Sequence, residues 1–160
     1  VVDILFSTSA SSPTLPTSYT VFRRIGSIVR RSDAILGFAQ DGDEFLLNVP
    51  ILDVDATTGS VAALSRTLTV PLGIKVSAMI RARGTNASNW GVLISSPDVP
   101  DTAPNITDAP GVDIGASAGT GDRATLTVRT NTSAEIRTRN TATSQTLQIV
   151  TYGWIDRRGK

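Results

Sequence analysis

Apolar residues occupy alternate positions in most segments of this chain, and Thr, Ser or Arg fill many of the positions between them. Side chains of a β-strand point alternately to its two faces, so this pattern predicts strands that each bury one face. Turn-forming residues recur about every 8–12 positions, and no segment has the spacing of an amphipathic helix. The pattern therefore predicts an all-β fold, an antiparallel β-sandwich of the jelly-roll kind. The clearest strand is 74–83, whose inward face would carry Ile74, Val76, Ala78, Ile80 and Ala82.

Ten to twelve short strands are predicted. Asp41-Gly42, between two apolar runs, indicates a hairpin, and Pro50 is predicted to stop the strand that begins at Glu44. We expect 1–18 to form an N-terminal strand and a Ser/Thr/Pro connector, and 19–160 to form a single sandwich domain. The predicted strands are 2–6, 19–31, 35–40, 44–49, 51–54, 64–70, 74–83, 90–95, 112–116, 123–130, 134–139 and 145–155.

The last predicted strand carries apolar residues on both faces. Leu147, Ile149 and Ile155 are predicted on one face, and Val150, Tyr152 and Trp154 on the other. Such a strand is either central and buried within its own chain, or covered on its outer side by another subunit. Both interpretations stay open. For the second, the candidate contact residues are Tyr152, Trp154, Asp156 and Arg157, since Arg and carboxylate groups pair in a bidentate geometry.

The composition restricts the chemistry available to this chain. It has no His, no Cys and only two Glu, which excludes a His-dependent serine triad, a Cys nucleophile and the His or Cys ligands of zinc sites. The segment 53–59 faintly resembles a calcium loop, but Thr58 stands where Gly is needed and Leu64 where a bidentate Glu is needed. We therefore predict no catalytic residue, no cofactor and no metal ligand, and a protein that is not an enzyme.

The charge is nearly balanced, with 15 Lys and Arg against 14 Asp and Glu. This balance favours neither nucleic acid nor an anionic membrane as partner, and no apolar run approaches the length of a membrane helix, about 18 residues. The absence of Cys, and so of disulfides, is typical of a cytosolic or prokaryotic site of assembly. The chain begins in strand-like sequence without Met, so we expect it to be a piece of a longer protein.

Loops on rigid sheets commonly carry recognition, which directs attention to 84–89 and 97–110. The candidate ligand-binding residues there are Asn89, Trp90, Asp98 and Asp101. An indole at the edge of a loop can stack on a sugar ring. The alternative is that Trp90 begins its strand and packs in the core.

Two segments resemble bacteriophage virion proteins. One is 19–28, with the sequence YTVFRRIGSI, followed by Gly42-Asp43-Glu44-Phe45; the other is the terminal 152–160, YGWIDRRGK. Further likeness at 11–16, 66–74 and 94–98 extends the resemblance over most of the chain. It departs from the family between Ile28 and Ile35, where Arg30-Arg31-Ser32-Asp33 replaces a Gly-rich hairpin.

The resemblance implies the C-terminal domain of a phage tail fibre, spike or similar appendage of the virion. Such parts are commonly homotrimers that contact other virion proteins and often face the host, so a host cell-surface glycan becomes an expected partner. Two alternatives remain. One is a capsid decoration or trimerisation domain without a receptor, and the other is a carbohydrate-binding accessory domain of a depolymerase.

Overall fold

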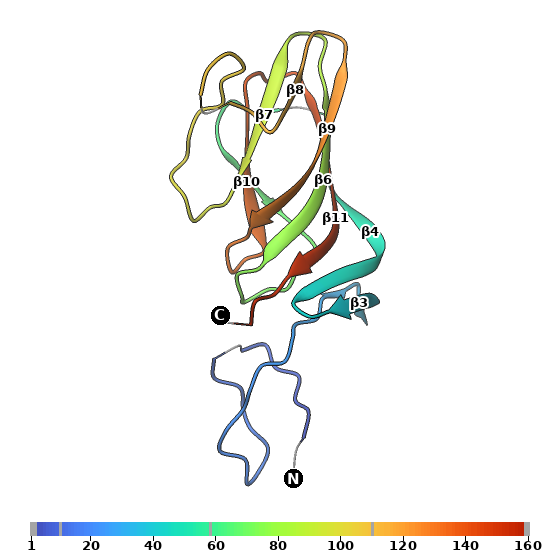
Figure 1. Cartoon of the computed structure of the whole chain (residues 1–160), viewed down its shortest axis with the longest axis vertical. Coiled ribbons are helices and arrows are strands. Elements are labelled where there is room, and N and C mark those ends of the chain that lie inside the picture. Colours follow the sequence, from blue (N-terminus) through green and yellow to red (C-terminus); the bar gives the residue numbers. More distant parts are fainter. Residues whose placement is uncertain (1–2, 10, 58, 110, 159–160) are drawn as a thin grey trace.

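The computed structural model describes residues 3–9, 11–57, 59–109 and 111–158. Within these ranges the chain forms eleven strands and no helix. Figure 1 shows how the longer strands are arranged. The strands are β1 (Arg30–Arg31), β2 (Ala34–Ile35), β3 (Phe38–Asp41), β4 (Glu44–Ala56), β5 (Leu64–Thr67), β6 (Ser77–Thr85), β7 (Trp90–Ser95), β8 (Ile114–Ala116), β9 (Gly121–Arg129), β10 (Glu135–Asn140) and β11 (Thr146–Ile155).

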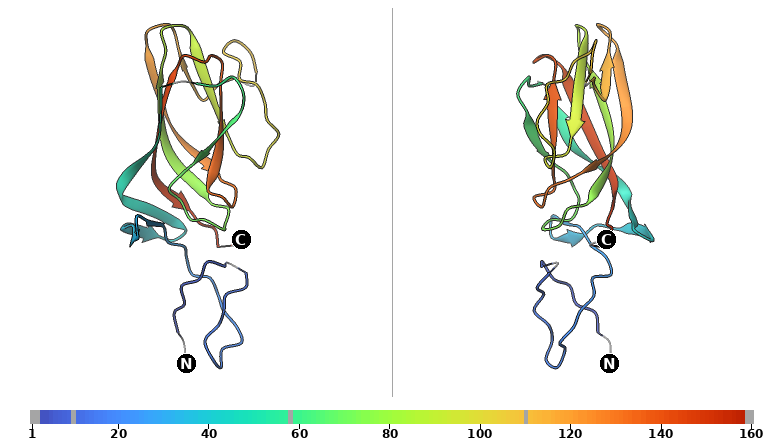
Figure 2. Two further views of the ribbon diagram at one scale, coloured as in Figure 1. Left: turned by 180° about the vertical axis from the view of Figure 1, so that it is seen from behind. Right: turned by 60° about the vertical axis from the view of Figure 1, so that its left-hand side comes forward.

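Two antiparallel sheets form the layers of a sandwich (Figure 2). One has the strand order β5-β10-β7-β8 and the other β3-β4-β11-β6-β9. Each early strand pairs with a late one: β4 with β11, β5 with β10, β6 with β9 and β7 with β8. A long hairpin rolled up on itself gives this nested pairing, which is the jelly-roll topology. The predicted fold is confirmed.

The core lies between the two sheets and follows the predicted alternation. Ala78, Ile80 and Ala82 of β6 are buried, and Arg81 and Arg83 on the opposite face are exposed; Met79, on that same opposite face, is buried. The same alternation along β10 and β11 places apolar side chains from both sheets in one cluster. The largest fully buried side chains include Trp90, Trp154, Phe45, Ile80, Ile114, Ile136, Leu147 and Ile149.

The N-terminal arm, defined as the described residues of 3–28, lies beyond one end of the sandwich (Figure 1). It contains no strand, so the predicted strand at 3–6 is wrong, and of the predicted strand 19–31 only Arg30–Arg31 forms. Residue 2 of the first prediction lies outside the described residues. A strand needs a neighbour to accept and donate its backbone hydrogen bonds, and the described residues place no strand beside the arm.

The strand that begins at Glu44 does not stop at Pro50, contrary to the prediction; β4 continues to Ala56. The predicted hairpin before it is confirmed, since Asp41 pairs with Glu44. The β3 strand pairs with β4 only over residues 44–47, so beyond this point one side of β4 is a sheet edge. Proline lacks the N–H donor of a ladder and is tolerated at an edge.

The C-terminal strand β11 contains a β-bulge at Tyr152. Thr151 pairs with Ile80 and Gly153 with Met79, so Tyr152 is an extra residue opposite β6. A bulge shifts the alternation of faces by one residue. Trp154 therefore points inward with Leu147 and Ile149, and all three are completely buried. The predicted faces were wrong for Trp154 and Ile155, because a strict period of two cannot anticipate the bulge.

Candidate functional site

Trp154 lies in an aromatic cluster inside the sandwich. Its indole stacks on Phe45, with ring centroids 5.1 Å apart and planes 8° from parallel, and meets the ring of Phe38 edge-on at 5.7 Å. The indole Nε1 donates a hydrogen bond of 3.0 Å to the hydroxyl of Ser27 at the end of the arm. Trp154 thus holds the arm to the sandwich and presents no surface to another subunit.

Asp156 is also committed within the chain. Its carboxylate accepts a hydrogen bond of 2.5 Å from the guanidinium of Arg24 and one of 2.9 Å from the backbone N–H of Arg158. The Arg158 side chain in turn pairs with the carboxylate of Asp43. Arg157 is exposed, and no hydrogen bond or ion pair joins its side chain to the described residues. Of the predicted contact residues beyond β11, only Arg157 is available to a partner.

Tyr152 lies on the outer face of the five-stranded sheet and is partly exposed. The guanidinium of Arg81 sits over its ring, 5.2 Å from the centroid, in a cation–π contact. Val150 and Leu52 are register partners beside it, and the side chain of Leu46 is 42% exposed nearby on β4. These four apolar side chains, Leu46, Leu52, Val150 and Tyr152, form what we call the outer-sheet patch.

The N-terminal arm carries a second group of exposed apolar side chains. Val21 is 80% exposed, Ile25 is 63% exposed, and Phe22 between them is about half exposed. Among the described residues, the backbone of 20–28 makes no hydrogen bond to other backbone groups. The carbonyl of Ile25 accepts a hydrogen bond of 3.4 Å from the side chain of Arg158. Exposed apolar side chains beside backbone groups that lack a backbone partner are features with which a segment can add to another chain.

The predicted ligand-binding residues are engaged in structural contacts. Trp90 is only 1% exposed, and its indole N–H donates to the carbonyl of Thr120 at 3.2 Å. The alternative, that Trp90 begins its strand and packs in the core, is confirmed. The Asn89 side chain accepts a hydrogen bond of 3.0 Å from the backbone N–H of Ala118. This end of β7 therefore offers no exposed aromatic platform at Trp90.

Asp98 and Asp101 fix the long loop to the sheets. Asp98 accepts hydrogen bonds from Lys75 at 2.5 Å and from Arg129 at 3.1 Å. Asp101 pairs with Arg139 at 2.7 Å. Both aspartates follow the last residue of β7, whereas Asn89 precedes its first, so the structure does not bring the four predicted residues together.

The ion pairs of Asp98 make its contribution to stability pH-dependent. The hydrogen bond from Lys75, assisted by the charges of Lys75 and Arg129, lowers the pKa of this carboxyl below its usual value of 3.8. A lowered folded-state pKa stabilises the protein above the unfolded pKa, and this stabilisation disappears as the pH falls through the folded pKa.

We therefore expect wild type and Asp98→Asn to differ most in free energy of unfolding at neutral pH. The difference should shrink as the pH falls below 3.8. Urea denaturation of both proteins across the acid range measures it. A difference that stayed constant with pH would show that Asp98 acts only through its shape.

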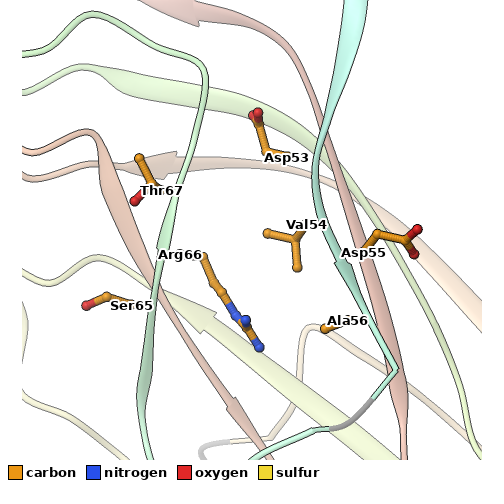
Figure 3. Close-up of a pocket in the computed structure, with 7 residues that line it drawn as sticks. All are labelled: Asp53, Val54, Asp55, Ala56, Ser65, Arg66 and Thr67. Atoms are coloured by element: carbon orange, nitrogen blue, oxygen red, sulfur yellow. The ribbon is translucent and has the colours of Figure 1, made fainter.

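A groove runs between β4 and β5 (Figure 3). The side chain of Arg66 extends into it, whereas Asp55 points away from it. The carboxylate of Asp53 is bonded instead to Thr69 and Thr151. Within the described part of the chain, no three acidic side chains gather closely enough to hold a metal ion. The groove contains one cation and no pair of free carboxylates.

No protein-family model matches the chain, and comparison with curated proteins finds no match. No helix among the described residues is long and apolar enough to cross a membrane. A function for the chain therefore has to be argued from its own residues, its topology and the resemblance described above.

Proposed function

We propose that this chain is a structural domain of a bacteriophage virion appendage, a tail fibre or spike, which assembles with copies of itself as a homotrimer. The observation that carries the proposal is the N-terminal arm: a strand-like segment outside the sandwich, with Val21, Phe22 and Ile25 exposed and no backbone partner in the described chain. In the assembly the arm of one copy contacts another copy.

The rest of the fold supports this role. Double-sheet jelly rolls recur in viral capsid proteins and lectins, which supports a virion role by fold analogy. The outer-sheet patch gives each copy a second apolar surface next to the buried core of β11. Covering one Val, Leu, Ile or Phe side chain contributes roughly 1.5–3 kcal/mol, so covering the three exposed arm residues in each copy stabilises an assembly appreciably.

Host-surface attachment is the second part of the proposal. All four predicted ligand residues, Asn89, Trp90, Asp98 and Asp101, are buried or bonded within the chain, so assembly has the stronger support. Of the alternatives, a capsid decoration domain would use the same arm and the same patch. A carbohydrate-binding accessory domain has less support because its expected aromatic platform, Trp90, lies in the core.

Light scattering coupled to size-exclusion chromatography tests the assembly. We expect a species of about 50 kDa at micromolar concentration, three times the 16.8 kDa of one chain. The triple variant Val21→Asp, Phe22→Ser, Ile25→Asp should elute as a monomer, because it places charged and polar groups where a partner must bury apolar ones.

The matched control is the double variant Val99→Asp, Ile106→Asp, which makes a similar change at exposed positions of the long loop. It should leave the trimer intact. A wild-type chain that runs as a monomer would reject the proposal for this domain, and loss of the trimer in the control would remove the arm as its specific cause.

A further inference from the structure

A small cavity lined with cations lies where the arm meets the ends of three strands. Its cationic residues come from four places: Arg24 from the arm, Lys75 from just before β6, Arg129 from the end of β9 and Arg157 from just after β11. The hydroxyl-bearing Ser77 and the carboxylate of Asp156 complete its polar lining. The cavity volume is about 130 Å³. Residues distant in the sequence thus bring four positive charges to one small space.

The carboxylates nearby do not neutralise these cations. Asp156 lines the cavity and Asp98 bonds two of the lining cations, so four positive charges meet two negative ones and an excess of two remains. Both oxygens of Asp156 already accept hydrogen bonds, from Arg24 and from the backbone of Arg158.

The arginines keep spare donors. A guanidinium has a fork of several N–H donors, and Arg24 and Arg129 each use one of theirs on a carboxylate. The side chain of Arg157 uses none on the described residues. Lys75 and Arg129 also lower the pKa of Asp98 through their hydrogen bonds and charges.

We propose that this cavity is a binding site for one oxyanion group, a carboxylate, sulfate or phosphate. Guanidinium forks match the geometry of these groups, and hydrogen bonds assisted by charge are the strongest that side chains make. The volume corresponds to about four water molecules at roughly 30 Å³ each, which suits one such group. The site stands on its own geometry and is independent of the proposed trimer.

The group can belong to a free inorganic anion or to an acidic sugar, and calorimetric titration separates these sources. The probes are inorganic phosphate, sulfate and glucuronate, each at constant ionic strength set with chloride, with glucose as the uncharged control. We expect saturable binding at one site per chain for at least one anion and none for glucose. Binding of glucuronate alone would identify the ligand as an acidic sugar. Binding of phosphate or sulfate alone would identify it as a tetrahedral oxyanion.

Two substitutions test the location of the site. Arg157→Ala should weaken binding about tenfold, since one charge-assisted hydrogen bond corresponds to about one factor of ten. Arg123→Ala is the control, because it removes the same charge from an exposed position near the other end of β9. It should leave the affinity unchanged.

Asp98→Asn should change the affinity for the anion in the opposite direction. It removes a carboxylate that competes for Lys75 and Arg129, so we expect the anion to bind severalfold more tightly. Any of three results would overturn the assignment: no saturable binding of any of the three anions, equal weakening by Arg157→Ala and Arg123→Ala, or no gain of affinity in Asp98→Asn.

Discussion

Replacing Trp154 by alanine should lower the free energy of unfolding by about 3–5 kcal/mol, the usual cost of deleting a buried aromatic side chain. The indole is completely buried, stacks on Phe45 and holds Ser27 of the arm through its N–H. The substitution leaves a cavity beneath the arm as well as an unpaired hydroxyl. Urea denaturation followed by circular dichroism, at one protein concentration for all variants, measures the loss.

Trp154→Phe is the matched control. It keeps an aromatic ring against Phe45 and loses the hydrogen bond to Ser27, so we expect a smaller loss than with alanine. A loss below about 1 kcal/mol for Trp154→Ala would contradict the core position, since substitutions on the surface usually change stability by less than that. That result would favour the interpretation in which Trp154 lies in a subunit contact, one of the two that the sequence leaves open.

Asp53→Ala should also be strongly destabilising, with an expected loss of about 3 kcal/mol in the free energy of unfolding. Asp53 is the extra residue of a bulge in β4, since Val54 pairs with Ile149 and Leu52 with Val150. Its carboxylate, only 6% exposed, accepts bonds from the backbone and hydroxyl of Thr69 and from the hydroxyl of Thr151. Removing it leaves several nearly buried donors without an acceptor, which costs about 1–3 kcal/mol for each group.

Asp55→Ala provides the comparison for Asp53. It lies two residues further along β4, and its exposed carboxylate accepts one hydrogen bond, from Gln148 at 3.0 Å. We expect its loss to change stability by no more than about 0.5 kcal/mol. The same denaturation experiment compares the two variants. Equal effects would show that the bonds of Asp53 do not distinguish it from an ordinary surface carboxylate.

The strands with strict alternation were predictable because burial of one face dictates their sequence. The segment 90–95 matches β7 residue for residue, and the inward residues predicted for 123–130 face the core on β9. In these strands the local pattern and the final sheet agree, which is the usual property of a sequence that folds to one structure. The number of strands and the spacing of their turns predicted the class of fold, a jelly roll, but did not predict which strands pair.

The features missed from the sequence depend on contacts between distant residues. The bulge at Tyr152 turns Trp154 inward, and nothing in the local alternation marks it. Arg24 meets Asp156 across 132 positions of sequence, so their pairing leaves no local signal. The sequence of the arm predicts a strand because its composition is typical of strands. In the described part of the chain, however, no neighbouring strand pairs with it.

The position of β11 also has a consequence for how the protein is made. The strand lies between β4 and β6 in the middle of the larger sheet, yet it is synthesised after every other strand of the sandwich. Until then, β4 and β6 expose unpaired edges, which favour aggregation, and the nested pairing gives a high contact order, which slows folding. A polypeptide that terminates before β11 lacks the strand that closes the sheet. The larger sheet can therefore be completed only after translation has passed through this strand.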